Sequence, residues 1–442
     1  KGPDGAPRAA MSHFDIAIAG CGPAGLAAAL LLHRQGHRVT LFDRFEQPRP
    51  VGSGLMIQPS GLAVLAALGL APDILAHGAP IRALHGLNHQ GDIALDARYA
   101  DLGIPGARGI GIHRGSLFTL LYRAVAAEGI GIETGFAVER SDLVGNGRAL
   151  ASSERQTTRS FDLVVDALGT SSPLAPRCGE WLAFGALWAT LDWPADAPFD
   201  VGLLEQRYTH ATQMAGVLPT GIRVDGTCKE MSFFWSLKAS AYEAWCEAGL
   251  DAWKAQVCTL WPDCEGLLTH IIEPEQLTFA RYAHRRLPEP TSERMIHIGD
   301  AWHSASPQLG QGANMALLDA FALSRGLANG DGLQDGLHRA VDLRSRHVKL
   351  YQALTWAATP LYQSDSVWHA LLRDFLLTPL GRIPPGPRIQ ARLVSGLVGD
   401  PLTTLGLPLP DYAALGRPRD HGISGVSTTS SIAARASSLA QS

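Results

Sequence analysis

Cysteine, lysine and long apolar runs are all scarce in this chain of 442 residues. The six cysteines show no Cys-x-x-Cys spacing, which argues against a structural zinc site and suits the reducing cytoplasm. No apolar run reaches the roughly 18 residues that a membrane-spanning helix needs. Only 18% of the residues are charged and the net charge is −4, so a basic face for nucleic acid is missing. We expect a cytoplasmic globular protein with no metal site, no nucleic-acid partner and no transmembrane segment.

The two ends of the chain are expected to lie outside the folded part. Residues 1–10 read as a leader foreign to the fold, because Met11 would make a natural start. Residues 422–442 are rich in serine, alanine and threonine and contain no aromatic residue, a composition typical of a disordered tail. The stretch between them is long enough to bury a large core without help from disulfides.

A glycine-rich motif stands between a predicted strand and a predicted helix within residues 14–42. It reads Gly-x-Gly-x-x-Gly, with glycines at 20, 22 and 25, and Asp43 follows the next strand about twenty residues on. In dinucleotide-binding folds the first glycine makes the tight turn, the second admits the pyrophosphate and the third lets helix and strand pack. The helix N-terminus faces the phosphates, and the acidic residue accepts hydrogen bonds from the ribose hydroxyls. The spacing therefore predicts a dinucleotide site.

A second glycine-rich element spans residues 295–319. An apolar strand runs into Asp300, and after a loop Gly310 and Gly312 precede a helix. An aspartate at a strand end can bind a ribose or ribityl hydroxyl, and the glycines let backbone N–H groups face a ligand. The positive end of the helix dipole would stabilise the negative charge of a reduced flavin. This element predicts a contact region for a flavin nucleotide.

Three segments together resemble the class A flavoprotein monooxygenases, which have the p-hydroxybenzoate hydroxylase fold. They are the first glycine motif, the stretch around Arg114 and the element at 299–320, and the resemblance covers residues 12 to about 400. It implies an FAD-dependent monooxygenase that takes electrons from NAD(P)H and transfers one atom of O2 to a small organic, preferably aromatic, substrate through a C4a-hydroperoxide. The FAD-binding residues that it implies are Gly20, Gly22, Pro23, Ala24, Gly25, Asp43, Arg44, Arg114, Asp300, Pro307, Gly310, Gly312, Ala313 and Asn314.

The change of pattern along the chain predicts an interrupted α/β fold. Between about 181 and 280 aromatic residues become frequent and strand patterns replace the alternation of strands and helices. We expect a Rossmann-type FAD-binding domain interrupted by a β-rich substrate domain and followed by C-terminal helices, in a monomer or homodimer. The predicted boundaries are 11–80, 99–180 and 281–330 for the FAD-binding domain, 81–98 and 181–280 for the substrate domain, and 331–400 for the helices.

One motif of the family is altered in this sequence. Leu168 stands where the family has an aspartate, and Ala175 where it has an arginine, in a segment that serves both FAD and NAD(P)H binding. Asp166 and Arg177 lie two residues away, about 6.6 Å along a strand, so we expect neither to substitute. The use of nicotinamide is therefore open, and a flavoprotein oxidase or dehydrogenase reduced by its own substrate remains an alternative.

The sequence offers few candidates for the chemistry itself. His303 and Pro307 lie in the predicted flavin loop, although a structural loop histidine is the leading interpretation for His303. No general base is assigned. Residues that could form an aromatic substrate pocket, or only pack a core, fall on the inserted sheet: Tyr208, His210, Phe233 and Trp235.

Three further functions remain possible on the same scaffold. Baeyer–Villiger oxygenation or N-oxygenation would differ only in where the oxygen atom enters the product. A flavin-dependent halogenase is disfavoured, because its Trp-x-Trp-x-Ile-Pro element is missing. A flavin-binding assembly partner without turnover is the alternative from another class of protein.

Overall fold

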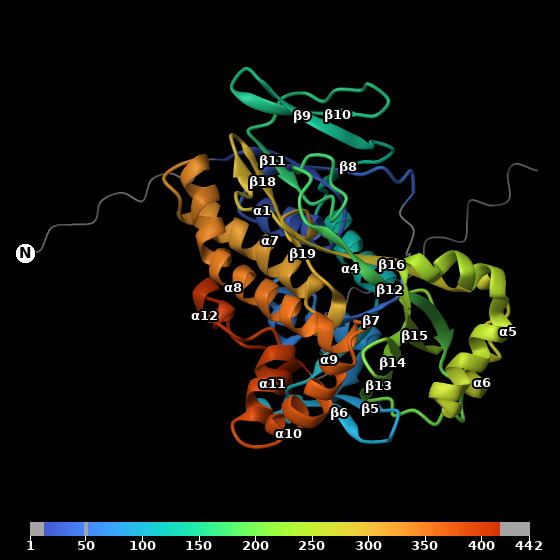
Figure 1. Ribbon diagram of the computed structural model, residues 1–442. Helices are drawn as coiled ribbons and strands as arrows, with labels where there is room; N and C mark the ends of the chain where they lie inside the picture. Colours follow the sequence, from blue (N-terminus) through green and yellow to red (C-terminus); the bar gives the residue numbers. More distant parts are fainter. Residues whose placement is uncertain (1–12, 48–51, 416–442) are drawn as a thin grey trace, which may run out of the picture.

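The structure is a computed structural model that describes residues 13–47 and 52–415 (Figure 1). The leader expected at 1–10 and the tail expected at 422–442 lie outside the described residues. Within these limits the two largest sheets have six and eight strands. The predicted fold class is confirmed: a parallel sheet with helices, a second antiparallel sheet and C-terminal helices are all present.

The six-stranded sheet carries the first glycine motif. Four of its five strand pairs are parallel, and only the edge strand β17 runs antiparallel to its neighbour. β1 is an almost continuous apolar run because both of its faces are buried: Ile16 and Ile18 share a core with Leu26, and Ala17 and Ala19 share another with Val138 and Leu150. In spatial order the strands are β17 (Thr291–Ser292), β18 (Met295–His297), β11 (Leu163–Asp166), β1 (Asp15–Ala19), β2 (Arg38–Phe42) and β8 (Gly131–Glu133).

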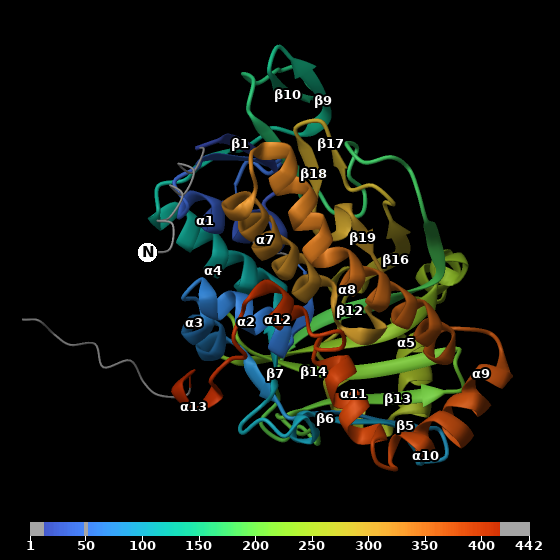
Figure 2. The same ribbon diagram turned by 90° about the vertical axis from the view of Figure 1, so that its left-hand side faces the viewer.

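Helix α1 (Pro23–His33) packs between two other helices beside this sheet (Figure 2). It begins at Pro23, whose fixed φ suits the first helical position, and Gly36 takes the left-handed conformation after its end. Every residue from Ala24 to Leu32 is buried, because α4 (Arg114–Ala127) and α7 (Gly312–Asn329) both contact α1. The two glycine-rich elements are thereby brought onto neighbouring helices.

The eight-stranded sheet separates two cores. It is antiparallel except where β13 pairs with β5. One face packs on α5 (Tyr242–Leu260), with Phe233, Trp235 and Trp253 in that core. The other face turns toward the six-stranded sheet. In spatial order the strands are β19 (His303–Ser304), β16 (Thr278–Arg286), β12 (Glu180–Asp192), β15 (Lys229–Lys238), β14 (Gln213–Ile222), β13 (Leu203–Thr209), β5 (Ala83–Asn88) and β6 (Ile93–Arg98).

Smaller elements complete the part around the first glycine motif. A three-stranded sheet contacts β14, and a separate two-stranded hairpin lies at one end of the molecule (Figure 1). The elements are β3 (Gly54–Ile57), β7 (Gly109–His113) and β4 (Ala79–Ile81) in the sheet, β9 (Val138–Val144) and β10 (Gly147–Ser152) in the hairpin, and helices α2 (Pro59–Ala67) and α3 (Ala71–His77). Helix α6 (Glu265–Leu268) lies elsewhere, beside α5 (Figure 1).

The C-terminal helices run from α7 to the far edge of the eight-stranded sheet. The long helix α8 packs along α7, and the helices after it reach β6 (Figure 2). They are α8 (Leu333–Tyr362), α9 (Val367–Leu372), the π-helical turn η7 (Arg373–Leu377), α10 (Thr378–Gly381), α11 (Gly386–Val394), α12 (Pro401–Leu405) and α13 (Tyr412–Leu415).

Three of the predicted domain boundaries fall inside strands. The boundary at 280/281 lies within β16, the boundary at 180/181 within β12, and the boundary at 80/81 within β4. In addition, β19 comes from the predicted FAD-binding segment 281–330 but extends the eight-stranded sheet. The strands therefore continue across these three points, where a change of sequence pattern suggested a break.

Candidate functional site

The first glycine motif forms a tight turn with one open side. Gly20 has φ +106°, which an L side chain rarely adopts, and its N–H donates to the carbonyl of Phe42 at 2.8 Å. A Cβ on Gly25 would lie 1.9 Å from the carbonyl oxygen of Gly20, so this position admits only glycine. A Cβ on Gly22 would meet no protein atom within 4 Å. Gly22 is therefore open where a phosphate group must approach.

Asp43 closes this motif from the end of β2. Its Oδ2 accepts a hydrogen bond of 2.6 Å from the Cys21 N–H, which fixes the carboxylate beside the glycine turn. Asp43 is half-buried, while its neighbour Arg44 is exposed. One carboxylate oxygen holds the loop, so the other is the atom that can reach a ribose hydroxyl.

The second glycine element meets the first at Gly299. Gly299 has φ +59°, and a Cβ there would lie 3.2 Å from the Cβ atoms of both Ala24 and Ala316. The starts of α1 and α7 therefore contact the same residue. The two motifs, which are far apart in the sequence, form one continuous region of the fold.

A cavity of about 900 Å³ lies between the second glycine element, the eight-stranded sheet and α8. The predicted cofactor and pocket residues that line it are Arg114, Asp300, His303, Pro307, Gly310, Gly312, Ala313 and Tyr208. The predicted residues of the first motif do not line it: Gly20, Gly22, Pro23, Ala24, Gly25, Asp43 and Arg44. The structure thus divides the predicted cofactor residues into two groups, one at the β1–α1 turn and one on the cavity wall.

Asp300 presents its carboxylate to the cavity. No hydrogen bond to this carboxylate is made by any residue that the structure describes. Loss of hydration inside the protein raises the pKa of Asp300, and the nearby charges of His303 and Arg114 partly counter this rise. A carboxylate left without a partner at a strand end is suited to accept hydrogen bonds from the hydroxyl groups of a ligand.

Asn314 is not among the residues that line the cavity, and its role at the cofactor stays a prediction. Its Oδ1 accepts from the Gln58 N–H at 2.8 Å, and its Nδ2 donates to the carbonyls of Met56 and Gly310, both at 3.0 Å. The bonds to Met56 and Gln58 fasten the start of α7 to β3 and to the residue before α2, and the bond to Gly310 stays within the glycine loop. The side chain of Asn314 is buried and positions this loop.

Three of the four predicted pocket residues lie outside the cavity. Phe233 and Trp235 point to the opposite face of β15 and pack in the core under α5. Phe234, between them, lines the cavity instead, because successive side chains of a strand alternate between its faces. His210 is exposed in the turn after β13, where its ring lies 5.0 Å from that of His89. Only Tyr208 of this set reaches the cavity.

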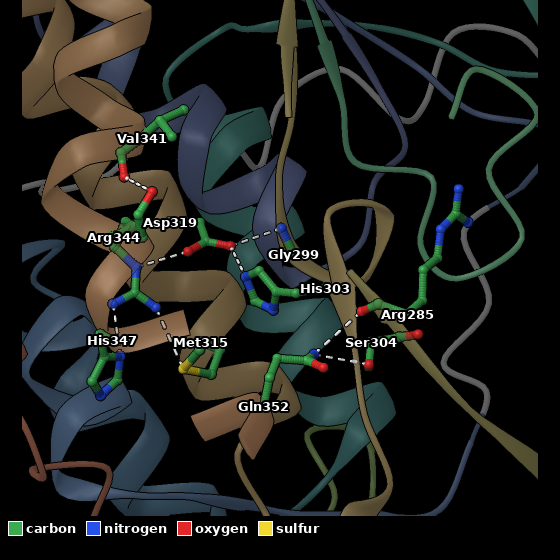
Figure 3. Close-up of polar contacts among 11 residues, drawn as sticks. Arg285, Gly299, His303, Ser304, Met315, Asp319, Val341, Arg344, His347 and Gln352 are labelled. Atoms are coloured by element: carbon green, nitrogen blue, oxygen red, sulfur yellow. Dashed lines mark hydrogen bonds and ion pairs between the residues drawn. The ribbon is translucent and has the colours of Figure 1, made fainter. Parts of the chain in front are cut away.

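His303 is held by a buried ionic network that the sequence analysis missed (Figure 3). Its Nε2 donates to Asp319 Oδ2 at 2.6 Å, and Arg344 Nε donates to Asp319 Oδ1 at 2.8 Å. Arg344 Nη1 also donates to His347 Nδ1 at 2.8 Å. All four side chains are buried. A single carboxylate within the apolar helix sequence 315–323 was the available signal, because an unpaired buried charge is too costly to persist.

Asp319 and His347 differ in their charge within this network. Burial alone would raise the pKa of Asp319, but His303 and Arg344 outweigh it and hold the pKa at about 2. Burial, reinforced by the charge of Arg344, lowers the pKa of His347 to about 2. At neutral pH Asp319 is therefore ionised and His347 is neutral. The imidazole of His303 is oriented by an anionic partner on the side away from the cavity.

The neutral state of His347 predicts a loss of stability in mild acid. In the unfolded chain this histidine takes up a proton below about pH 6.5, whereas the folded protein resists protonation until far lower pH. Folding stability should therefore fall as the pH drops, by about 2 kcal/mol between pH 6.5 and 5. Urea unfolding at both pH values measures this slope. His347→Gln should show a slope smaller by that amount, and an equal slope in both proteins would contradict the assignment.

The altered motif of the family is packed into the protein. Leu168 contacts the core beside β1, and Ala175 packs in another core with Trp302. Both apolar replacements are therefore accommodated by packing.

The turn after β11 is organised by other residues instead. Asp166 accepts from the Leu168 N–H at 3.0 Å, from Ser172 Oγ at 2.6 Å and from His297 Nδ1 at 2.7 Å. Arg285 donates to the carbonyls of Thr170 and Pro176, at 2.5 and 2.7 Å. Arg285 was not predicted, because it reaches this turn from β16 of the other sheet.

These features define a class of protein. The open side of Gly22 and the unpartnered carboxylate of Asp300 fit a dinucleotide whose phosphates meet the start of α1 and whose ribityl chain passes Asp300. The fold and site are those of a flavoprotein. No group of three or more His, Cys, Asp or Glu side chains is arranged to hold a metal ion in residues 13–47 and 52–415.

Comparison with known proteins identifies the family. The model of the FAD binding domain family matches residues 13–353, and the chain belongs to this family. It is 29% identical over 353 residues to the phenazine 1,6-dicarboxylic acid hydroxylase of Lysobacter antibioticus, covering 74% of this chain and 85% of that protein. It is 24% identical to the 6-hydroxynicotinate 3-monooxygenase of Pseudomonas fluorescens, covering 70% and 81%. The chain is an FAD-dependent monooxygenase, as the sequence predicted.

Solved structures agree with this fold. The tetrameric form of 2-methyl-3-hydroxypyridine-5-carboxylic acid oxygenase superimposes with a TM-score of 0.71 at 21% identity, covering 88% of this chain and 98% of that one. Klebsiella pneumoniae HpxO, complexed with FAD and uric acid, gives a TM-score of 0.70 at 18% identity and covers 90% and 98%.

Proposed function

We propose that this monooxygenase hydroxylates a planar aromatic ring, bound in the cavity of about 900 Å³ with the second glycine element on one side. The observation that carries this proposal is the aromatic lining contributed by the eight-stranded sheet and the end of α8. The lining aromatics are Trp188, Tyr208, Phe234, Tyr282 and Tyr362. Aromatic faces favour offset or tilted stacking with a flat ring, which orients it as well as burying it.

Two pairs of rings build this lining. Trp188 and Phe234 have centroids 4.7 Å apart, and the Trp188 indole N–H donates to the Tyr282 hydroxyl at 2.9 Å. Tyr208 and Tyr362 have centroids 5.4 Å apart.

The guanidinium of Arg373 lies 4.8 Å from the Tyr208 ring centroid and stiffens the second pair. Its charge is matched by Asp374, whose Oδ1 accepts from Arg373 Nε at 2.6 Å. The wall is therefore an aromatic surface without a free charge from this arginine.

Gln363 supplies a polar group in the same wall. It is only 5% exposed, it lines the cavity, and neither its amide nitrogen nor its amide oxygen has a partner in the described part of the chain. A buried amide without partners costs free energy unless a ligand satisfies it. We therefore propose that Gln363 pairs with a donor and an acceptor on the substrate, as a hydroxylated or carbonyl-bearing heterocycle provides. The names of the relatives above include a phenazine, a nicotinate and a pyridine carboxylate.

Replacing Gln363 by methionine tests this pairing. Methionine keeps the length of the side chain and removes both polar atoms, so the free protein should be as stable or more stable. The substrate should bind about 10-fold or more weakly, which corresponds to the loss of one or two hydrogen bonds. KM and the melting temperature are the measurements. An unchanged KM for every accepted heterocycle would remove Gln363 from the binding site.

Bound FAD, reduced by NAD(P)H, supplies the activation of O2. The residues of the chain hold and orient the cofactor and the substrate. Asp300 and Arg114 face the cofactor side of the cavity, and Pro307 with Gly310 to Ala313 forms the loop against which a flavin ring can lie. His303 presents its imidazole to the cavity while Asp319 fixes its orientation. We keep His303 as the proposed proton-holding group and Pro307 as a packing contact.

One alternative retains a specific observation in its favour. Leu168 and Ala175 replace the polar pair that serves nicotinamide binding in the family, so a substrate could be the electron donor. Anaerobic titration of the FAD-loaded protein with NADPH and then NADH, each with candidate heterocycles present, separates the two. Bleaching of the oxidised flavin by nicotinamide supports the monooxygenase with its usual donor. Bleaching by the heterocycle alone would establish an oxidase or dehydrogenase. A protein that retains no FAD would refute both.

We include a cytoplasmic location in the proposal. All six cysteines are free, as a reducing compartment requires. We also propose a monomer or homodimer, which light scattering on the purified protein would settle.

A further inference from the structure

The C-terminal helices expose an unusual amount of apolar surface. Eleven of the seventeen large apolar side chains that are exposed in the described residues lie between Trp356 and Ile389. We call this region, on α9, η7, α10, α11 and the adjoining end of α8, the apolar cap. Its most exposed members include Trp368 at 79% and Phe375 at 73%. The other six are scattered singly or in pairs along the chain. A contiguous patch of this kind marks an interaction site.

The apolar cap is fastened to the protein by its polar side. Thr378 Oγ1 donates to the carbonyl of Ala94 at 3.0 Å, on the edge strand β6. Within the cap, Arg373 Nη1 donates to the carbonyl of Leu361 at 3.0 Å and ties the later helices to the end of α8. α10 and α11 both contact β6, and the helices lie together at one end of the molecule (Figures 1 and 2). The apolar side chains therefore project outward from an anchored base.

The charge of the apolar cap is positive. The apolar cap has two carboxylates, and both are already paired: Asp365 with Lys238 of β15, and Asp374 with Arg373. Arg382 and Arg388 are exposed and form no ion pair with any residue that the structure describes. Exposed tryptophan, phenylalanine and leucine beside unpaired arginines are the composition of helices that lie in the interface of an anionic membrane.

We propose that the apolar cap docks the protein on an anionic phospholipid surface. No helix of the described residues is long and apolar enough to cross a bilayer, so the contact is with one leaflet. A second copy of this chain fits less well, because a two-fold interface would bury the unpaired arginines of both patches, while the carboxylates of each patch are already paired. The chain beyond residue 415 fits less well too, since it carries three arginines and one aspartate.

The same segment also forms part of the cavity wall. Leu361, Leu377, Thr378 and Arg382 line the cavity, and Leu377 and Arg382 are exposed as well. A cap resting in the headgroup layer places the cavity next to the apolar part of the leaflet. This arrangement favours an aromatic substrate with an apolar substituent that partitions into the membrane. This inference about the substrate rests on the proposed hydroxylation.

Vesicle sedimentation with the FAD-loaded full chain tests the docking without any measurement of activity. The probes are vesicles of phosphatidylcholine alone and vesicles that also contain phosphatidylglycerol, at low and high salt. Trp368→Ser/Phe375→Ser should weaken partitioning onto the anionic vesicles by about tenfold or more. Arg388→Gln should weaken it by about fivefold at low salt and have little effect at high salt. The control is Val201→Ser/Ile272→Ser, which removes two exposed apolar side chains elsewhere, at 52% and 74% exposure.

Binding to anionic vesicles that is lost in the cap variant and kept in the control variant would establish the docking surface. Circular dichroism and FAD content confirm that both variants fold. Absence of binding to either kind of vesicle would overturn the proposal. If, in addition, the native chain is a dimer that Trp368→Ser/Phe375→Ser converts to a monomer, the cap is an interface between copies. Failure of the hydroxylase assignment would leave the vesicle result unchanged, so the two proposals are judged separately.

Discussion

Gly22→Val is expected to abolish the retention of FAD while leaving the fold intact. Gly22 has φ −70° and ψ 178°, a conformation that valine adopts readily, and its Cβ would meet no protein atom within 4 Å. The new side chain would instead occupy the space in front of α1 that the pyrophosphate needs. FAD affinity should fall by at least about 100-fold, which is close to 3 kcal/mol of binding free energy. Absorbance of the purified protein and titration with added FAD measure it.

Gly25→Val is the matched control for this prediction. Its Cβ would lie 1.9 Å from the Gly20 carbonyl oxygen, so the β1–α1 turn itself must distort. This variant should lose stability with and without FAD, whereas Gly22→Val should melt at the temperature of the FAD-free native chain. If Gly22→Val keeps its yellow colour through gel filtration, the phosphates do not approach at Gly22, and the placement of the nucleotide at the start of α1 would have to be abandoned.

Asp319→Ala is expected to produce the largest loss of folding stability, about 3–5 kcal/mol. The substitution leaves the guanidinium of Arg344, a fully buried group, without its carboxylate partner. It also removes the acceptor for the His303 imidazole and for the Gly299 N–H, which Asp319 Oδ2 accepts at 2.9 Å. Urea unfolding of the FAD-free protein at pH 7 measures the change, so that ligand binding does not enter.

The origin of this loss can be isolated with a second substitution. Arg344→Met added to Asp319→Ala removes the stranded positive charge and should restore part of the stability, because an apolar pair replaces a broken ion pair. Asp335→Ala serves as the control, since the Asp335–Arg339 pair is exposed and little change is expected. If Asp319→Ala behaves like that surface variant, the buried network contributes nothing measurable and its proposed role in fixing His303 fails.

The part of the fold that the sequence predicted is the part encoded by short spacings. The turn at Gly20, the start of α1 at Pro23 and the carboxylate of Asp43 are set by neighbours within one βαβ unit. A tight turn needs glycine, and proline is common at the first position of a helix, so both features can be predicted from adjacent residues. The second glycine element is local in the same sense, which is why Asp300 and Gly310 were expected at the cofactor site.

The substrate wall could not be predicted in the same way. Both faces of the eight-stranded sheet are covered and both carry aromatic side chains, so the alternation along β15 did not reveal which face meets the cavity. Phe233 and Trp235 were candidates for either the pocket or a core; they pack in the core, and Phe234 lines the cavity. The bonds of Asn314 to Met56 and Gln58 could not be predicted, because these partners are far away in sequence. A side chain's role is set by contacts across the fold, which no local pattern contains.

The helices beyond α8 also determine whether the chain can be shortened. β6 is the last strand of the eight-stranded sheet, and η7, α10 and α11 lie against it. A shortened protein ending at Tyr362 would present unpaired N–H and C=O groups along this strand, a template for pairing between molecules. Such a protein would keep both glycine elements and still be prone to aggregate. The practical boundary for expression, crystallisation or fusion of this enzyme therefore lies after α11, although the FAD binding domain family model ends at residue 353.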